Sequence, residues 1–379
     1  MIPKKLAIVV SHPIQYYAPL FAVLAKEIDL KVFYCHNPTP DEVGKDGFGQ
    51  AFSWDIDLLK GYNYEFLKNV SKNPSVTAKD GCDTPDIGTH LMVYGATHVV
   101  VFGWYLKSHL QALEFCNKQG IPIAARGDSQ LVPSQHWLKR LVKRLYYPFF
   151  LSRYDAFLSV GKRNRRYLEY YGVKSGKILF SPHAVDQDFW KVERVRHDKI
   201  VFVWVAKFIP KKRPFDVIES FLLALGELKD TNGVELHMVG TGELLEEAKQ
   251  KSMQHSTIKF LGFKNQTELK PIYANSSSLI LSSDYLETWG LVVNEGFASG
   301  LPAIVSKAAG CSQDMITNNT GMVYPVGNVV ELKKCMVHFV RILQNKEGVD
   351  RFEKGIAAIN KEYSFERNVV SFQEFLTLN

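Results

Sequence analysis

The segment SLILSSDYLETWGLVVNEGFASGLPAIV, residues 278–305, contains the pattern that decides the fold. A short apolar run, Ser278 to Leu281, is followed by a polar loop, a helical stretch, a Gly-Leu-Pro turn and a second apolar run, Ala303 to Val305. Two apolar strands joined by a helix are the crossover unit of a parallel sheet. The segment therefore predicts an α/β fold built on a doubly wound sheet.

Similar β-branched runs recur along the whole chain and alternate with helical patterns. In the first half they are Leu6–Val10, Lys31–Tyr34, His98–Phe102, Ile121–Ala125 and Ala156–Val160; in the second half they are Ile200–Val205, Glu235–Val239, Ile258–Leu261, Ser278–Leu281 and Ala303–Val305. Each half is therefore predicted to form its own Rossmann-like sheet. Ligands of such sheets bind beyond the carboxyl ends of the strands, so two such edges facing each other would form a cleft.

The chain contains 379 residues, which is about two or three times the usual length of one domain, so two domains are expected. Pro182 to Lys199 has no periodicity and is the candidate linker. We expect a first domain of residues 1–190 and a second domain of residues 191–362. Phe365 to Phe375 has the pattern of an amphipathic helix with Ser364 as its N-cap, and we expect residues 363–379 to pack back on the first domain.

Cysteine usage and hydropathy favour a cytoplasmic protein. The five cysteines are odd in number and contain no Cys-x-x-Cys pair, so neither a disulfide framework nor a zinc knuckle is indicated. The run Leu6 to Val10 is too short for a signal peptide, and Ser11-His12-Pro13 ends it. No apolar stretch approaches the roughly 18 to 20 residues that span a bilayer. Any membrane contact is therefore expected to be peripheral.

Positive charge is concentrated in residues 135–170, which carry nine of the basic residues and only Asp155 and Glu169 as acids. Such a patch is expected to face an anionic partner. Within it, Trp137 to Leu145 has apolar residues at helical spacing with cations between them. One interpretation is a helix that lies on an anionic membrane at its inner face. The alternative is a helix whose apolar side packs on the core and whose basic side is solvated. No recognised motif supports nucleic-acid binding.

The loop and helix after Leu281 contain the strongest candidate ligand site. Glu287 lies at the mouth of the loop and Glu295 about two turns along the helix. The backbone N–H groups of Gly290, Leu291 and Val292 open the helix, where a phosphate is favoured. A carboxylate can accept both hydroxyls of a ribose. The alternative is that Glu287 only favours the helix N-terminus and that Glu295 is only solvated.

Two glutamates with seven residues between them, followed by the Gly-Leu-Pro turn, resemble the signature of the retaining family 4 glycosyltransferases. The resemblance extends in the expected order to Val205–Phe208, Pro210–Lys212, Val239–Gly242 and Phe260–Phe263. Ser11–Tyr17 and Arg126–Ser129 look like a bacterial branch of that family. The resemblance implies the GT-B fold and a donor that is a nucleoside-diphosphate sugar, UDP- or GDP-linked, with no cofactor or metal required.

The resemblance also implies roles for single residues of the second domain. Glu295 would bind the ribose, Glu287 the hydroxyls of the donor sugar, and Lys207 with Lys212 the diphosphate. Lys207 stands where the family usually has arginine, so it keeps the charge but loses a bidentate grip. Lys211 and Arg213 are close enough in the sequence to leave the assignment open.

Glycines and an aromatic residue complete the expected donor site. Gly240 and Gly242 follow a strand and can let the backbone approach a ligand, although a plain turn is the alternative. Gly262 and Phe263 lie, by the resemblance, where main-chain groups would read the base, and the alternative for Phe263 is a place in the core.

In the first domain we single out His12, Arg126 and Asp128. His12 follows the first strand and is expected near the donor phosphates or the acceptor. Arg126 and Asp128 are expected to pair at the acceptor side, and a purely structural pair is the alternative. Two Asp-x-Asp sequences, residues 55–57 and 186–188, lie away from the diphosphate loop and are interpreted as incidental.

The sequence thus predicts a retaining glycosyltransferase that uses a sugar nucleotide and a glycan or lipid-linked acceptor in bacterial polysaccharide, lipopolysaccharide or glycoconjugate synthesis. The alternatives are a nucleotide-sugar epimerase of the same fold and a non-enzymatic protein that binds anionic surfaces.

Overall fold

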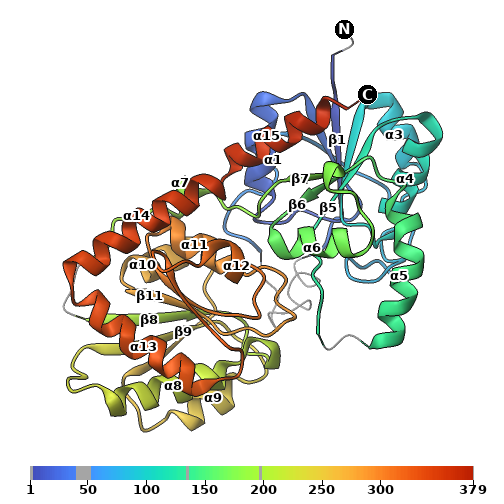
Figure 1. Ribbon diagram of the computed structural model, residues 1–379. Coiled ribbons are helices and arrows are strands. Elements are labelled where there is room, and N and C mark those ends of the chain that lie inside the picture. Colours follow the sequence, from blue (N-terminus) through green and yellow to red (C-terminus); the bar gives the residue numbers. More distant parts are fainter. Residues whose placement is uncertain (1–2, 40–52, 134–135, 196–198, 379) are drawn as a thin grey trace. The chain divides into compact units, whose positions relative to one another are not determined.

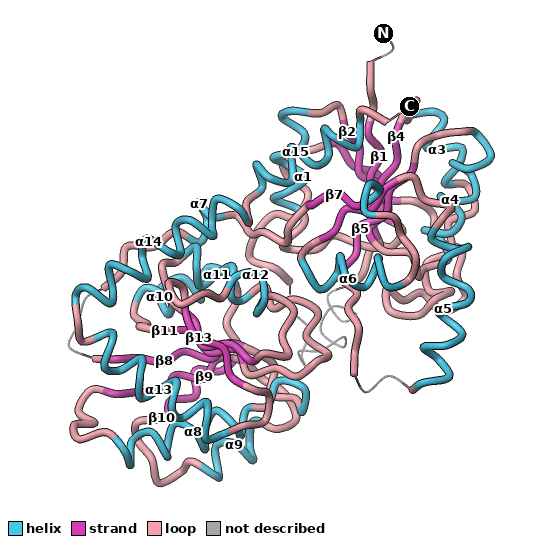
Figure 2. The backbone as a smooth tube through the Cα atoms, in the orientation of Figure 1, coloured by secondary structure: helices cyan, strands magenta, loops and turns pink. Residues whose placement is uncertain are grey.

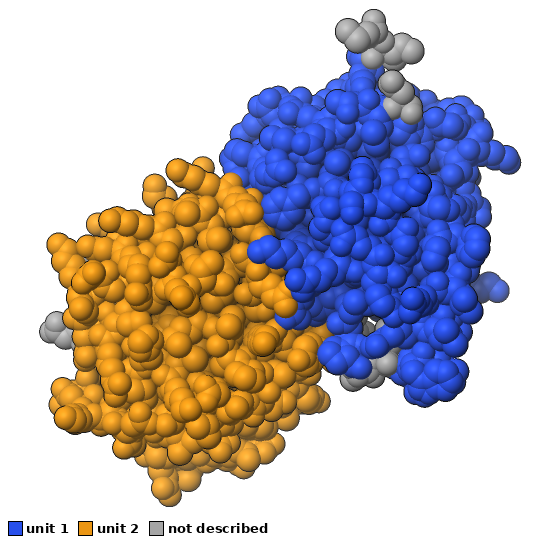
Figure 3. All heavy atoms as spheres, viewed as in Figure 1, with its two compact units in different colours: residues 1–39, 56–183, 364–379 blue, residues 40–55, 184–363 orange. Residues whose placement is uncertain are grey.

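The computed structural model describes residues 3–39, 53–133, 136–195 and 199–378, and these form two compact units. The first unit contains residues 3–39, 56–183 and 364–378, and the second contains residues 53–55 and 184–363 (Figure 3). Each unit has a parallel sheet with helices on both faces, so each is a doubly wound α/β domain (Figure 2).

The first unit has a seven-stranded sheet in the order β3-β2-β1-β4-β5-β6-β7. All its neighbouring strands pair in parallel. The strands are β1 (Leu6–Val10), β2 (Leu30–Tyr34), β3 (Asn63–Phe66), β4 (His98–Phe102), β5 (Ile123–Gly127), β6 (Ala156–Ser159) and β7 (Ile178–Phe180).

The second unit has a six-stranded sheet in the order β10-β9-β8-β11-β12-β13. Its neighbouring strands are again parallel. The strands are β8 (Ile200–Val205), β9 (Val234–Val239), β10 (Ile258–Gly262), β11 (Ser278–Leu281), β12 (Ala303–Ser306) and β13 (Gly321–Tyr324).

The central strands consist of near-continuous apolar runs because helices cover both faces of each sheet. Every residue of β1, β4 and β11 is buried. The ten strands expected from the sequence are all present. Four of them begin and end at the expected residues, namely β1, β4, β8 and β11. The fold class expected from the sequence is therefore confirmed for each unit.

Helices α1 and α15 lie on one face of the first sheet, and α3, α4 and α5 lie on the other (Figure 1). The helices of this unit are α1 (Ala18–Glu27), α3 (Ile87–Tyr94), α4 (Lys107–Gln119), α5 (Trp137–Leu151), α6 (Lys162–Tyr170), the 3-10 turn η1 (Ser175–Lys177) and α15 (Phe365–Leu376).

Helices α8, α9 and α13 lie on one face of the second sheet, and α10, α11 and α12 lie on the other (Figure 1). The helices of this unit are α7 (Gln187–Trp190), η2 (Pro210–Lys212), α8 (Pro214–Glu227), α9 (Leu245–Lys251), α10 (Gln266–Ala274), α11 (Val292–Ala298), α12 (Ser312–Met315), α13 (Val329–Leu343) and α14 (Lys346–Glu362). The short helix α7 lies within the segment that the sequence indicated as a linker.

Helix α15 returns to the first unit after the chain has completed the second sheet. The Ser364 side chain caps its N-terminus by accepting from the Arg367 N–H. Asn368, fully buried, accepts a hydrogen bond from the Ser181 hydroxyl at 2.6 Å and donates to the Pro182 carbonyl at 3.1 Å. These contacts attach the last helix to the chain segment that follows β7.

Two further observations concern the whole of the described chain. Among the described ranges no helix is both long and apolar enough to cross a membrane. All five cysteines are buried free thiols.

Candidate functional site

The second sheet has a topological switch point between β8 and β11. These two strands are neighbours, yet the chain continues from β8 toward β9 and from β11 toward β12, on opposite sides. The loops that follow the carboxyl ends of these two strands therefore run in opposite directions. Ligands of doubly wound sheets bind in the crevice that forms at such a switch point. The loop after β8 contains Lys207 and Lys212, and the loop after β11 contains Glu287.

Lys212 and Glu287 form an ion pair across this switch point, between the Lys212 Nζ and the Glu287 Oε2. Their side chains are 17% and 15% exposed, so the pair is largely withdrawn from water. Burial opposes ionisation of the carboxyl, but the Lys212 ammonium outweighs it and lowers the pKa of Glu287. Glu287 is therefore a charged group that only accepts hydrogen bonds.

The two loops are held together by hydrogen bonds beneath this ion pair. The Ser282 hydroxyl donates to the Lys212 carbonyl at 2.6 Å and accepts from the indole N–H of Trp204 at 2.9 Å. The Asp284 N–H donates to the Lys211 carbonyl at 2.9 Å. Trp204 is a fully buried residue of β8, so the core of the sheet fixes the position of the Lys212 backbone.

Arg213, which the sequence left as an alternative to Lys212, is bound elsewhere. Its guanidinium donates to both carboxylate oxygens of Asp216, at 2.5 Å and 3.1 Å. Its backbone is in the left-handed region, with φ 52°, at the start of α8. Lys212 is thus the basic residue of this turn that pairs with Glu287.

The loop that carries Lys207 is paired with the loop after β9. The Phe208 N–H donates to the Thr241 carbonyl at 2.9 Å, and the Leu244 N–H donates to the Phe208 carbonyl at 2.9 Å. Lys207 itself is half-buried. The backbone of Lys207 is therefore fixed by the neighbouring loop.

Gly240 and Gly242 are needed for this close pairing of the two loops. Both have positive φ, 135° and 151°. A Cβ on Gly240 would lie 1.9 Å from the Ala206 carbonyl oxygen, and one on Gly242 would lie 2.6 Å from the Phe208 carbonyl oxygen. These glycines thus serve backbone packing beside Lys207, a reason that the sequence did not reveal.

Gly262 ends β10 next to the same loops. Its φ is 70°, and its carbonyl accepts a hydrogen bond from the Gly240 N–H at 2.8 Å. Phe263 follows it and is half-buried, so it is not a residue of the closed core. Both residues lie at the carboxyl edge of the sheet, two strands from β8.

The backbone of residues 290–292 offers three consecutive donors at the start of α11. Gly290 has φ 104°, and a Cβ there would lie 2.5 Å from the Leu281 side chain. Within residues 199–378, no protein acceptor takes the N–H of Gly290, Leu291 or Val292. Such donors at a helix start favour an anion.

Glu295 lies on α11 and accepts a hydrogen bond from the Tyr273 hydroxyl at 3.0 Å. Burial raises the pKa of Glu295 to about 7, although the Tyr273 hydrogen bond opposes the shift. Tyr273 comes from α10 and is fully buried. Sequence reasoning missed Tyr273, because nothing in the pattern of α10 links it to a residue two elements later.

His12 lies directly after β1, which borders the switch point of the first sheet between β1 and β4. Its Nδ1 is 2.9 Å from the Ser11 hydroxyl. Burial, reinforced by His36, lowers the pKa of His12 to about 4, so the imidazole is neutral near pH 7.

Arg126 and Asp128 follow β5 but differ in their surroundings. Arg126 is 1% exposed, and its guanidinium donates to the Ser181 hydroxyl at 2.8 Å and to the Pro182 carbonyl at 3.0 Å. The Asp128 Oδ2 lies 4.0 Å from the His183 Nε2, and burial, reinforced by Arg126, keeps the pKa of His183 well below its ordinary value. Arg126 therefore holds the chain segment after β7, whereas Asp128 is half exposed at the carboxyl edge.

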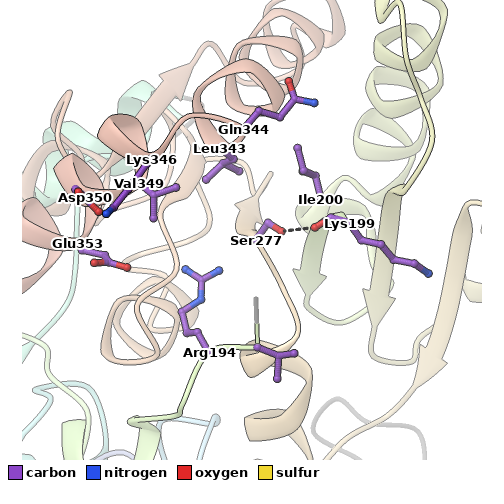
Figure 4. Close-up of a pocket in the computed structure, with 11 residues that line it drawn as sticks. Arg194, Lys199, Ile200, Ser277, Leu343, Gln344, Lys346, Val349, Asp350 and Glu353 are labelled. Carbon is purple, nitrogen blue, oxygen red and sulfur yellow. Dashed lines mark hydrogen bonds between the residues drawn. The ribbon is translucent and has the colours of Figure 1, made fainter. Parts of the chain in front are cut away.

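A pocket of about 490 Å³ opens elsewhere on the second unit (Figure 4). It is lined by Lys199, Ile200 and Ser277, at the amino ends of β8 and β11, and by residues of α14. The Arg194 guanidinium within it is bound to the carbonyls of Gly300 and Ser276. This pocket lies at the opposite edge of the sheet from Lys212 and Glu287.

Carboxylates of the two Asp-x-Asp sequences accept hydrogen bonds from backbone N–H groups. Asp186 accepts from the Phe189 N–H at 3.0 Å and caps α7, and Asp55 accepts from the Thr267 N–H at 2.9 Å. Asp57 accepts from the Leu59 N–H at 3.0 Å. In the part of the chain that the structure describes, no three His, Cys, Asp or Glu side chains form a group that could hold a metal ion.

Lys212 and Glu287 both lie within the part of the chain that matches a known protein family. Residues 186–355 match the family model described as Glycosyl transferases group 1. The uncharacterized glycosyltransferase MJ1607 of Methanocaldococcus jannaschii is 26% identical over 136 residues, 35% of this chain and 33% of that protein. A GDP-mannose-dependent alpha-mannosyltransferase of Mycobacterium tuberculosis is 36% identical over 124 residues, 32% of each chain. The match thus spans about a third of the length of these relatives.

Similarity to solved structures covers the whole chain. The structure of Anabaena Alr3699/HepE in complex with UDP has a TM-score of 0.72 at 13% identity, over 98% of this chain and 99% of that one. At this identity the likeness concerns the fold, and it shows that the chain has the GT-B fold.

Proposed function

We propose that the protein is a retaining glycosyltransferase that moves a sugar from a nucleoside-diphosphate sugar to an acceptor hydroxyl. The observation that carries the proposal is the charged Lys212–Glu287 pair at the switch point between β8 and β11. A cation for phosphate and a carboxylate for hydroxyls lie side by side there. The family match to residues 186–355 supports it, because that region contains both residues.

The diphosphate is assigned to Lys207, Lys212 and the N–H groups of residues 290–292. As the diphosphate leaves, negative charge grows on its oxygens, and cations already held in place stabilise that charge without reorganisation. Lys212 is held in this way by Glu287 and by the bond from Ser282 to its carbonyl. Lys207 supplies a point charge without the bidentate geometry of arginine.

Glu287 is assigned to the hydroxyls of the donor sugar. The bond between the anomeric carbon and the diphosphate oxygen breaks, and the diphosphate takes the electron pair. The acceptor oxygen bonds to the anomeric carbon on the same face, and its proton passes to the departing phosphate oxygen. The transition state is oxocarbenium-like, and no protein side chain becomes covalently attached. Lys212 and Glu287 thus bind the two groups that the reaction separates.

The nucleoside is assigned to Glu295 and to the carboxyl end of β10. Glu295 would accept both ribose hydroxyls, and Tyr273 holds its carboxyl by a hydrogen bond at 3.0 Å. Gly262 and Phe263 would contact the base. The donor is UDP- or GDP-linked: the mycobacterial relative uses GDP-mannose by its name, and Alr3699/HepE was solved with UDP.

The acceptor is assigned to the first unit. Two polar side chains of this unit, Asp128 and the neutral His12, follow the carboxyl ends of its strands and are at least partly exposed. The buried Arg126 holds the chain segment after β7 through its hydrogen bond to the Pro182 carbonyl. We propose a glycan or lipid-linked acceptor in bacterial polysaccharide, lipopolysaccharide or glycoconjugate synthesis, in the cytoplasm. The support for this class is the likeness of residues 11–17 and 126–129 to a bacterial branch of the family.

Turnover of a panel of UDP- and GDP-sugars tests this function. We expect one donor to release free nucleoside diphosphate, and Glu287→Gln to slow that release about 100-fold. Glu246→Gln, the same change at a side chain 76% exposed on α9, is the matched control and should leave the rate unchanged. Recovery of a sugar nucleotide with an altered sugar and no free diphosphate would instead identify an epimerase.

A further inference from the structure

Helix α5 exposes apolar side chains to an unusual extent. Of its residues only Phe150 and Leu151 are buried. Large apolar side chains elsewhere on the helix are exposed: Trp137 67%, Leu138 48%, Leu141 48%, Val142 64%, Leu145 67%, Tyr146 58% and Phe149 77%. Contiguous exposed apolar surface of this kind marks a site of interaction.

The exposed aliphatic residues of α5 and Phe149 form one stripe. At 100° per residue, positions separated by three, four, seven and eleven residues share one side of a helix. This spacing defines the apolar stripe, which consists of Leu138, Leu141, Val142, Leu145 and Phe149.

The opposite side of α5 faces the rest of the first unit and carries the half-buried Arg140 and Lys143 beside core-packed aromatic and aliphatic residues. Arg140 donates to the Val132 carbonyl at 3.1 Å. The Lys143 Nζ lies 5.2 Å from the ring centroid of Tyr147 and 5.9 Å from that of Tyr167. Phe150, Leu151 and Tyr147 attach the helix to the core of the first unit, whereas the apolar stripe lies away from that core.

Cations and amphipathic aromatic residues border the apolar stripe. Lys139 and Arg144 are exposed and fall on its two flanks by the same helical spacing. Trp137 and Tyr146 also lie at these margins and are exposed. The sequence of α5 contains no acidic residue. An apolar stripe with basic and Trp/Tyr margins is the pattern of a helix that lies in the interface of an anionic bilayer.

We propose that α5 docks the protein on an anionic lipid surface, with the apolar stripe at the boundary between headgroups and acyl chains. Lys139 and Arg144 then reach the anionic headgroups by snorkelling. Charge also argues against a second copy of this chain as the occupant. A twofold interface brings the same patch of each copy together, so two basic margins without any acidic residue of α5 would share one interface.

Flotation of the full chain with vesicles tests the docking surface. We expect binding to mixed phosphatidylcholine–phosphatidylglycerol vesicles, weaker binding at high salt, and little binding to phosphatidylcholine alone. The double variant Leu145→Glu/Phe149→Glu should lower the partition coefficient at least about tenfold. Met253→Glu is the matched control, because Met253 is 80% exposed in the second unit, and it should bind as wild type.

A second readout separates loss of docking from loss of folding. Trp137 fluorescence should shift to shorter wavelength with anionic vesicles, and the shift should be absent in Trp137→Phe. The thermal midpoints of the variants should match wild type, since the replaced side chains are exposed. Wild type that ignores anionic vesicles, or a double variant that binds them as wild type does, would overturn the proposal. So would a wild-type dimer that the double variant dissociates while vesicles have no effect.

Discussion

The carboxyl of Glu295 in the candidate donor site has a raised pKa. Burial raises its pKa from the ordinary 4.5 to about 7, so the folded protein disfavours the charged form. The stability contributed by Glu295 is therefore complete below about pH 4.5 and is lost as the pH rises through about 7. A ligand that donates hydroxyl groups to the carboxylate would relieve this cost.

Replacing Glu295 with glutamine is expected to stabilise the ligand-free protein at alkaline pH. Glu295→Gln keeps an acceptor for the Tyr273 hydroxyl and removes the buried charge. At pH well above 7 the free energy of unfolding should rise by about 3 kcal/mol, and near pH 4 it should be unchanged. Denaturant unfolding at both pH values measures this, and an equal effect at the two would contradict the assignment of the pKa.

The Lys212–Glu287 pair gives a test that separates stability from function. Lys212→Met leaves a buried carboxylate without its cation and should lower the free energy of unfolding by about 2 kcal/mol. Lys212→Met/Glu287→Gln removes both charges and should recover most of that loss. Sugar-nucleotide turnover should stay low in both variants. Recovery of turnover together with stability would show that the pair is only structural.

At the scale of elements, the pairing of the loops after β8 and β9 depends on two glycines. Gly240→Ala would bring its Cβ to 1.9 Å from the Ala206 carbonyl, so the loops must separate. We expect a loss of about 2 kcal/mol or more in the free energy of unfolding and weaker donor binding, because Lys207 would move. Chemical denaturation and calorimetry of the same variant measure the two effects.

Gly226→Ala is the matched control for this prediction. A Cβ at Gly226, on the exposed side of α8, has nothing within 4 Å, and alanine is favoured over glycine within helices. Its stability should be equal or higher by up to about 1 kcal/mol. Equal effects of the two substitutions would contradict the role of Gly240 in loop packing.

The central strands were predictable because they are apolar runs buried on both faces. The strands β3, β7 and β13 were not predicted. All three lie at sheet edges, and every residue of β3, with the sequence NYEF, is exposed or half-buried. An edge strand needs only one covered face, so its sequence lacks a continuous apolar run. Its backbone partner, rather than its own pattern, decides its conformation.

Parts of the candidate site depended on contacts that no local pattern encodes. The sequence singled out Arg126 but not its burial, because its partners Ser181 and Pro182 come from a distant segment. Tyr273 was missed for the same reason. By contrast Lys212 and Glu287 were indicated by the resemblance to the family motifs. Each lies in the loop after a strand, and the sheet topology makes those two strands neighbours.

At the scale of the whole molecule, the chain consists of two doubly wound units, and the residues proposed for the donor all belong to the second. The first unit contains His12, Asp128 and the α5 surface. Donor binding and membrane docking are thus assigned to different units. Substitutions in the apolar stripe of α5 should therefore leave the affinity for the sugar nucleotide unchanged.

Calorimetric titration of the full chain with UDP- and GDP-sugars tests whether the second unit binds a sugar nucleotide. We expect one donor to bind, with one site per chain. Glu295→Ala should weaken its affinity at least about tenfold, since a hydrogen-bonded charged group is lost. The control Glu246→Ala should bind as wild type. Absence of binding by every sugar nucleotide of the panel, or an unchanged affinity in Glu295→Ala, would contradict the account.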